Sequence, residues 1–543
     1  SLAIRLVRFV PSIVYYTRIH SLRVPKPLAT TRTASRSISS MRVPAHTRTG
    51  VEYSCFDKTT APGSSVSASM VDGGVDGLAP TTVHVVAPGA AGLAGLALSE
   101  AEKAWVEANS FTEPSSGDAI VIPSAAGGIG KVVMALDDTR DLWAFSKLRQ
   151  QVPAGTYRID FSGGAGSGSS SFSPSTAASL GWMLGAYSFE RYKSKAAAGG
   201  SAGARLLVWP ADLVAEEKSK LVAMVEGISL ARDMVSTPAE EMAPQHIEME
   251  ARSLAGRHSA SVTCIVGDDL LKENYPAIHT VGRACPNEPR LIDIRWKHPS
   301  AKKKVTLVGK GVSFDTGGLD LKPAAAMKLM KKDMGGAALV MGLAHAIMAT
   351  NMEVELRVLV PAVENSVAGN AFRPLDVLQT RAGITVENGN TDAEGRLILC
   401  DALAEAASER PDLILDAATL TGAARVALGT EMPALFCTSD EASDEIIKIS
   451  KDVKDYMWPM PLHAPYKSMI ASKVADIGSC SEGGYAGAIT AALFLQEFVS
   501  EFEGVWAHVD TMGYNLSSKP GRPEGGEALA LRALYQWLDR FIV

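Results

Sequence analysis

Charged residues that can support catalysis gather in two short stretches, 308–338 and 390–397. Their candidate functional members are Lys310, Asp315, Lys322, Asp333, Asp392, Glu394 and Arg396. Glycines flank almost all of them, and no Cys or His lies within either stretch. Carboxylates without Cys or His form hard oxygen sites, which suit Mg²⁺, Mn²⁺ or Zn²⁺. The two stretches therefore predict a metal site built mainly from carboxylates.

The carboxylates need positive charge beside them, because clustered acids repel one another. Asp392 and Glu394 are two residues apart, so both face the same side of an extended segment. Two metal ions about 3.5–4 Å apart would neutralise the cluster and activate a water molecule. The competing interpretation is that acidic residues in glycine-rich loops are solvated turns. The combination of both stretches favours the metal site.

Both stretches lie where an apolar strand gives way to a loop, the usual ligand-binding edge of an open α/β sheet. The body of the chain alternates short β-rich runs with helical patterns, which predicts an α/β protein with two domains. Strands are expected at 82–86, 119–122, 131–136, 157–160, 205–209, 262–266, 291–296, 305–308, 354–359, 413–416 and 505–509. Helices are expected at 100–108, 141–150, 175–192, 337–349 and 397–407.

Four segments follow from this pattern. Residues 1–75 form a leader outside the fold, and residues 76–210 form a smaller N-terminal α/β domain with a largely parallel sheet. An amphipathic helix over 211–236 links the domains and ends before Pro238, since the residue before proline resists the helical conformation. Residues 237–543 form the larger C-terminal α/β domain, which carries both charged stretches around a central mixed sheet.

The first fifty residues contain eight Arg, one Lys and no Asp or Glu. An Arg-rich, Ser-rich segment without acids is typical of a mitochondrial transit peptide. The chain starts with Ser, and Met41 can equally be the true initiator. Both interpretations stay open, so the location is cytoplasmic or, through this leader, mitochondrial.

Composition excludes several other classes. The first fifty residues hold nine basic residues, so the other 493 residues hold 44 basic and 59 acidic residues. This excess of acidic residues argues against a nucleic-acid partner. Six scattered Cys without a C-x-x-C favour neither a disulfide scaffold nor a zinc finger. The apolar run 337–349 is too short to span a bilayer and contains His345.

The two stretches resemble the leucyl aminopeptidase family, the hexameric cytosol aminopeptidases with a dinuclear metal site. The run NTDAEGRL at 390–397 matches the family signature. VGKG at 308–311, FDTGG at 314–318, LKP at 321–323 and MKKDMGGAA at 330–338 match in order and spacing. LARDMVSTPAEEM at 230–242, ATLTGA at 418–423 and WAHVDTMG at 506–513 extend the resemblance over the second domain.

The resemblance implies a role for each matching residue. The implied metal ligands, for two Zn²⁺ or Mn²⁺ ions per subunit, are Lys310, Asp315, Asp333, Asp392 and Glu394, with Asp315 and Glu394 bridging. Lys322 would donate to the carbonyl oxygen of the scissile bond, and Arg396 would hold a bicarbonate that acts as general base. The implied substrate-binding residues are Met330, Thr419, Leu420, Gly422 and Ala488.

The resemblance further implies a homohexamer that removes N-terminal Leu and other apolar residues from peptides with a free N-terminus, through a hydroxide activated by two metals. One alternative is a non-proteolytic DNA-binding or scaffold member of the same family. A dinuclear phosphoesterase is a second alternative, although such sites normally recruit His ligands.

Overall fold

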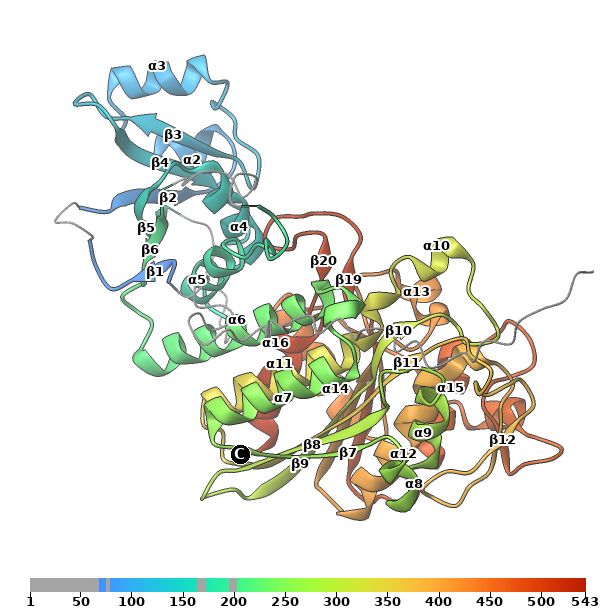
Figure 1. Cartoon of the computed structure of the whole chain (residues 1–543). Helices are drawn as coiled ribbons and strands as arrows, with labels where there is room; N and C mark the ends of the chain where they lie inside the picture. The colour runs from blue at the N-terminus through green and yellow to red at the C-terminus, as the bar shows by residue number, and fades with distance from the viewer. Residues whose placement is uncertain (1–67, 75–78, 164–171, 195–202) are drawn as a thin grey trace, which may run out of the picture. The chain divides into compact units, whose positions relative to one another are not determined.

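The computed structural model describes residues 68–74, 79–163, 172–194 and 203–543 (Figure 1). The expected transit peptide and Met41 lie outside these residues. The N-terminal region is built on a six-stranded sheet with the order β1-β6-β5-β2-β4-β3. Its strands are β1 (Met70–Val71), β2 (Thr81–Val86), β3 (Ala119–Pro123), β4 (Ile129–Ala135), β5 (Gly155–Gly163) and β6 (Arg205–Val208). Every neighbouring pair is parallel except β3 with β4, which confirms the largely parallel sheet.

Two details of this region differ from the sequence analysis. Strand β1 pairs with β6 and so brings Met70 and Val71 into the sheet, inside the segment assigned to the leader. A two-residue strand has no periodicity to detect. The N-terminal region also contains α2 (Ala90–Ala94), α3 (Glu100–Ala108), α4 (Leu142–Gln151) and α5 (Pro174–Leu184). Helix α5 ends eight residues before the predicted end at Tyr192. In the segment that follows the helix, the Tyr187 hydroxyl donates a hydrogen bond to Asp233 at 2.7 Å.

The C-terminal region is built on a nine-stranded mixed sheet with the order β16-β15-β18-β14-β9-β11-β8-β7, and β10 pairs with β11. Its strands are β7 (Ser261–Val266), β8 (Arg290–Lys297), β9 (Lys303–Gly309), β10 (Gly311–Asp315), β11 (Val354–Asn365), β14 (Leu413–Ala418), β15 (Ala434–Cys437), β16 (Trp458–Pro459) and β18 (Val505–Asp510). The central strands β18, β14, β9 and β11 run parallel, so their carboxyl ends meet at one edge. The predicted α/β fold with a mixed central sheet is confirmed.

Helices cover both faces of this sheet (Figure 1). One layer contains α6 (Ala215–Ser236), α7 (Pro244–His258), α11 (Gly335–Ala349), α14 (Asp440–Asp452) and α16 (Leu531–Phe541). The other contains α8 (Asp269–Lys272), α9 (Pro276–Gly282), α12 (Glu394–Ser408) and α15 (Gly487–Glu497). Helix α6 occupies the position of the expected linker helix and packs along α11. Among the described residues, no helix is both long and apolar enough to cross a membrane.

The close packing of α6 on α11 depends on two facing glycines. A Cβ at Gly342 would lie 2.4 Å from the carbonyl oxygen of Gly227, and a Cβ at Gly227 would lie 2.3 Å from that of Gly342. We therefore expect Gly342→Ala to force the helices apart and to lower the free energy of unfolding by about 1–3 kcal/mol. Chemical denaturation measures this. The control is Gly256→Ala on α7, where a Cβ meets nothing within 4 Å and should slightly stabilise the helix. An unchanged midpoint for Gly342→Ala would contradict the packing.

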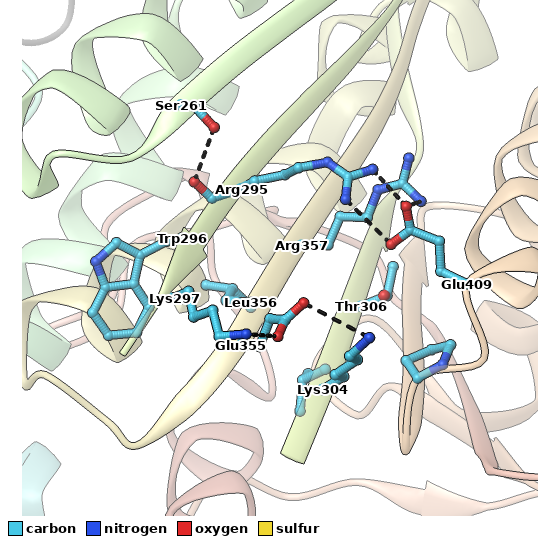
Figure 2. Close-up of a pocket in the computed structure, with 12 residues that line it drawn as sticks. Ser261, Arg295, Trp296, Lys297, Lys304, Thr306, Glu355, Leu356, Arg357 and Glu409 are labelled. Carbon is cyan, nitrogen blue, oxygen red and sulfur yellow. Dashed lines mark hydrogen bonds and ion pairs between the residues drawn. The ribbon is translucent and has the colours of Figure 1, made fainter. Parts of the chain in front are cut away.

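A network of ion pairs lies beside a surface pocket at the end of the sheet where the parallel strands β9 and β11 begin (Figure 2). Arg295 contacts Glu409 at 2.7 Å, and Arg357 contacts the same carboxylate at 3.2 Å. Lys297 contacts Glu355 at 2.6 Å on neighbouring strands. Each of these cations has a carboxylate partner, and the Lys297–Glu355 pair joins two paired strands, β8 and β11.

Candidate metal centre and active site

The two charged stretches meet at the edge where the parallel strands end. Strand β9 leads directly into Lys310, β14 leads into Thr419, β11 ends at Asn365 and β18 ends at Asp510. Because these strands are neighbours in the sheet, residues as far apart in sequence as Lys310 and Gly487 lie around one cavity. This is the ligand-binding edge expected for a parallel α/β sheet.

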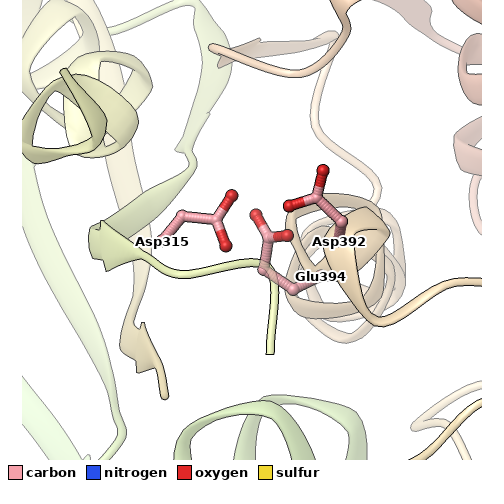
Figure 3. A group of neighbouring side chains, drawn as sticks. All are labelled: Asp315, Asp392 and Glu394. Atoms are coloured by element: carbon pink, nitrogen blue, oxygen red, sulfur yellow. The ribbon is translucent and has the colours of Figure 1, made fainter. Parts of the chain in front are cut away.

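Three carboxylates face one another at this edge (Figure 3). Asp315 ends β10, Asp392 lies in the short 3₁₀ turn Thr391–Ala393, and Glu394 is the first residue of α12. One oxygen of each lies within 4.8 Å of the other two. Asp315 and Glu394 are almost fully buried, so the structure places two acids where like charges are least screened.

Two lysines neutralise the cluster in this structure. The Lys310 ammonium lies 2.6 Å from Asp333 Oδ2 and 2.9 Å from Glu394 Oε1. The Lys322 ammonium lies 2.8 Å from Asp315 Oδ2 and also contacts Asp392. Lys310 can approach this closely only because residue 395 is glycine, where a Cβ would lie 2.6 Å from Lys310 Cε.

Burial and mutual repulsion dominate the ionisation of these groups. Burial, reinforced by the charge of Asp315, raises the pKa of Glu394 well above its usual range, and the same two causes raise the pKa of Asp392. Burial alone would lower the pKa of Lys310, but the carboxylates of Asp333 and Glu394 raise it further than burial lowers it. The pKa of Lys322 is likewise raised, by Asp315 against the effect of burial. Because the pKa values of these carboxyl groups are raised, further positive charge beside them would stabilise their ionised forms.

The residues present fit divalent cations. Glu394 Oε2 is buried and has no hydrogen-bond partner among the described residues, so one lone pair of the cluster is left for a ligand. The other candidates are carboxylates and one lysine, which binds a metal only as the neutral amine because an ammonium has no lone pair. Oxygen-rich donors with one nitrogen suit Mn²⁺ or Zn²⁺. Asp315, Asp392, Glu394, Asp333 and Lys310 would hold the ions.

Most of the residues expected at the site line one cavity of about 250 Å³. They are Lys310, Asp315, Lys322, Met330, Asp333, Asp392, Arg396, Thr419, Leu420 and Gly422. Two expected residues do not line it. Glu394 is buried against Lys310. Ala488 is buried on α15 in an apolar cluster with Ala424 and Phe436, and its neighbour Gly487 lines the cavity instead. Two further cations at the cavity, Lys332 and Arg425, were not singled out from the sequence.

Sequence reasoning also missed the residues that join the two charged stretches. Asn365 donates from Nδ2 to Asp315 Oδ1 at 2.9 Å and to the Thr391 carbonyl at 3.0 Å. The Thr391 hydroxyl donates to the Gly317 carbonyl at 2.6 Å, and the Thr391 amide donates to Asp320 Oδ2 at 2.7 Å. These bonds fix the orientation of Asp315 relative to Asp392. A polar residue at the end of an apolar strand, such as Asn365, was the available signal.

Arg396 and the loop after β14 are also held by specific contacts. Arg396 is buried and donates from Nη1 to the Ser479 carbonyl at 2.7 Å, while its Nε has no hydrogen-bond partner in the described chain. The Asp510 carboxylate accepts hydrogen bonds from the backbone amide of Leu420 at 3.0 Å and from the hydroxyl of Thr421 at 2.6 Å. Arg396 therefore keeps donor capacity, and Asp510 fixes the loop that carries Thr419 and Gly422.

Known solved structures share this fold over most of the chain. A cytosol aminopeptidase from Coxiella burnetii superimposes with a TM-score of 0.79 at 39% identity, over 88% of this chain and all of that one. The bottromycin maturation enzyme BotP, solved in complex with Mn, superimposes with a TM-score of 0.76 at 30% identity, over 86% of this chain and all of that one.

Sequence comparisons find similar relatives. A probable cytosol aminopeptidase of Corynebacterium glutamicum is 41% identical over 55% of this chain and 60% of its own length, which is less than two thirds of that relative. One from Geobacter is 39% identical over 66% of this chain and 74% of its own. The profile of the cytosol aminopeptidase family, catalytic domain, matches residues 229–535, and that of the M17 aminopeptidase N-terminal domain matches residues 94–206. The chain is therefore a member of the cytosol aminopeptidase family, a family of hydrolases that remove residues from the N-termini of peptides.

Proposed function

We propose that this protein is a dinuclear metallo-aminopeptidase that removes Leu and other apolar residues from the N-termini of peptides. The observation that carries the proposal is the cluster of Asp315, Asp392 and Glu394, beside a cavity that Asp315, Asp392, Lys322 and Arg396 line. Bound divalent cations would supply Lewis acidity and a water molecule activated near neutral pH. Asp315 and Glu394 are proposed to bridge the two ions.

The chain's own residues would then do three things. Lys322, held against the cluster, would donate to the carbonyl oxygen of the scissile bond and stabilise the negative charge that develops there. Arg396, with its unpartnered Nε, would hold a bicarbonate as general base. Met330 and Thr419 would contact the substrate side chain, while the Leu420 backbone, fixed by Asp510, would orient the peptide. An apolar pocket separates similar apolar side chains by only about 1–3 kcal/mol per methylene, so broad specificity follows.

The proposal includes the assembly of the protein and its location. We propose a homohexamer, and a cytosolic location in keeping with the relatives' names, rather than the mitochondrial alternative. The DNA-binding or scaffold alternative is not favoured, because the matched relatives are named aminopeptidases and every proposed metal ligand is present. The phosphoesterase alternative is disfavoured because no His of the described segments lines the cavity.

The test uses two substrates that differ only at the amino group. After reconstitution with Mn²⁺ or Zn²⁺, with metal content measured, we expect the protein to cleave a leucine 4-nitroanilide. We expect the N-acetylated compound to be inert, because the free α-amine would bind the metal centre. Release of nitroaniline measures both rates. Comparable cleavage of the blocked compound would contradict the exopeptidase assignment, and no cleavage of either by metal-loaded protein would contradict the proposed function.

A further inference from the structure

Two cations that line the active-site cavity have no role in the proposed reaction. Arg425 lies on α13 (Gly422–Leu428), one turn after Gly422, and Lys332 lies in the 3₁₀ turn Met330–Met334. Both line the cavity that Met330 and Thr419 also line. A Cβ placed at Gly422 would be 3.7 Å from Arg425 Nη2, so the guanidinium lies beside a residue proposed to contact the substrate side chain.

Neither cation has a carboxylate of its own. Within the described part of the chain, the Arg425 side chain makes no hydrogen bond or ion pair, and its Nη1 is shielded from solvent without a hydrogen-bond partner. The Lys332 side chain is almost fully buried, and the carboxylate nearest to its ammonium, Asp333 Oδ1, is 3.8 Å away. Asp333 is itself a proposed metal ligand. A guanidinium nitrogen that is shielded from water without a partner is unfavourable until an anion reaches it.

We propose that Arg425, with Lys332 beside it, binds the side-chain carboxylate of an acidic N-terminal residue, so that the enzyme removes N-terminal Glu and Asp as well as apolar residues. The inference rests on the proposed aminopeptidase function. Two features support the proposal. A guanidinium forms paired, charge-assisted hydrogen bonds with a carboxylate. Met330, which lines the same cavity, can pack against the aliphatic part of a Glu side chain. The same charges would repel N-terminal Lys and Arg.

The experiment compares glutamate and glutamine 4-nitroanilides, which have the same shape and differ in charge, with the leucine compound as reference. For the metal-loaded enzyme we expect kcat/KM for Glu to exceed that for Gln by about tenfold or more, since hydrogen bonds to charged groups are the strong ones. In Arg425→Gln we expect the Glu-to-Gln ratio to fall about 10- to 100-fold. Arg425→Lys, which keeps the charge, should retain part of the preference. The control is Arg252→Gln, an exposed arginine on α7 paired with Glu248, which should keep the parent ratio.

Binding gives a readout that does not depend on turnover. By calorimetry, free L-glutamate should bind the metal-loaded protein more tightly than L-glutamine, and Arg425→Gln should remove the difference. Equal kcat/KM for Glu and Gln in an enzyme that cleaves the leucine compound would overturn the inference and leave the proposed function standing. A Glu preference that survives in Arg425→Gln would also overturn it. Failure of the parent enzyme on all three substrates would instead overturn the proposed function.

Discussion

Replacing Asp315 or Glu394 by alanine should abolish both metal binding and peptide hydrolysis. Each side chain is proposed to bridge two ions, and the two face each other within the buried cluster. Removing one bridging carboxylate takes a ligand from both ions at once, and the remaining donors include Lys310, which binds only when neutral. We expect the metal content to fall from two ions per chain to none, and activity to fall to background.

Metal analysis of the purified variants, together with the leucine 4-nitroanilide assay, measures this result. The matched control is Glu441→Ala, which removes a fully exposed carboxylate on α14 and should keep both ions and full activity. Circular dichroism of the Asp315 and Glu394 variants should show an intact fold, which separates ligand loss from unfolding. Either variant retaining two ions per chain with near-normal turnover would refute the bridging assignment.

Replacing Lys322 by alanine should leave both metal ions in place and lower kcat by about 10²- to 10³-fold, the effect of losing one donor to a developing oxyanion. The Lys322 ammonium lies 2.8 Å from Asp315 Oδ2, and we propose that it stays protonated when the ions bind, so that it donates hydrogen bonds and has no lone pair for a metal. KM should change much less than kcat, because the donation strengthens only as charge develops on the carbonyl oxygen.

Steady-state kinetics and metal analysis on the same preparation test the Lys322 prediction. Lys328→Ala is the control, because this lysine lies six residues away in the same segment and is exposed to solvent. It should match the parent enzyme in kcat and in metal content. Loss of metal from Lys322→Ala would instead show that Lys322 is a ligand, and an unchanged kcat would remove it from the reaction.

The sequence by itself determined the fold class and the members of the charged cluster. The strands around the site are continuous apolar runs of β-branched and aliphatic residues, as in Val305–Val308, and such runs can be recognised without tertiary context. Loops that hold charged groups at strand ends are short and rich in glycine, so Asp315 and Glu394 stood out in the sequence. The α-helices at Glu100–Ala108 and Gly335–Ala349 were predictable for the same local reason, their apolar pattern and length.

Only the tertiary structure decided which polar residues meet. Asn365 reaches Asp315 because β10 pairs with β11, and that pairing joins segments fifty residues apart. Arg425 and Lys332 line one cavity because α13 and the turn before α11 both lie at it, which no local pattern encodes. Apolar periodicity reports which face of an element is buried, whereas the partner of a buried charge depends on strand order and register. Strand order and register are set by the packing of the whole chain. The sequence therefore identified the candidate ligands, whereas the fold determined their hydrogen-bond and ion-pair partners.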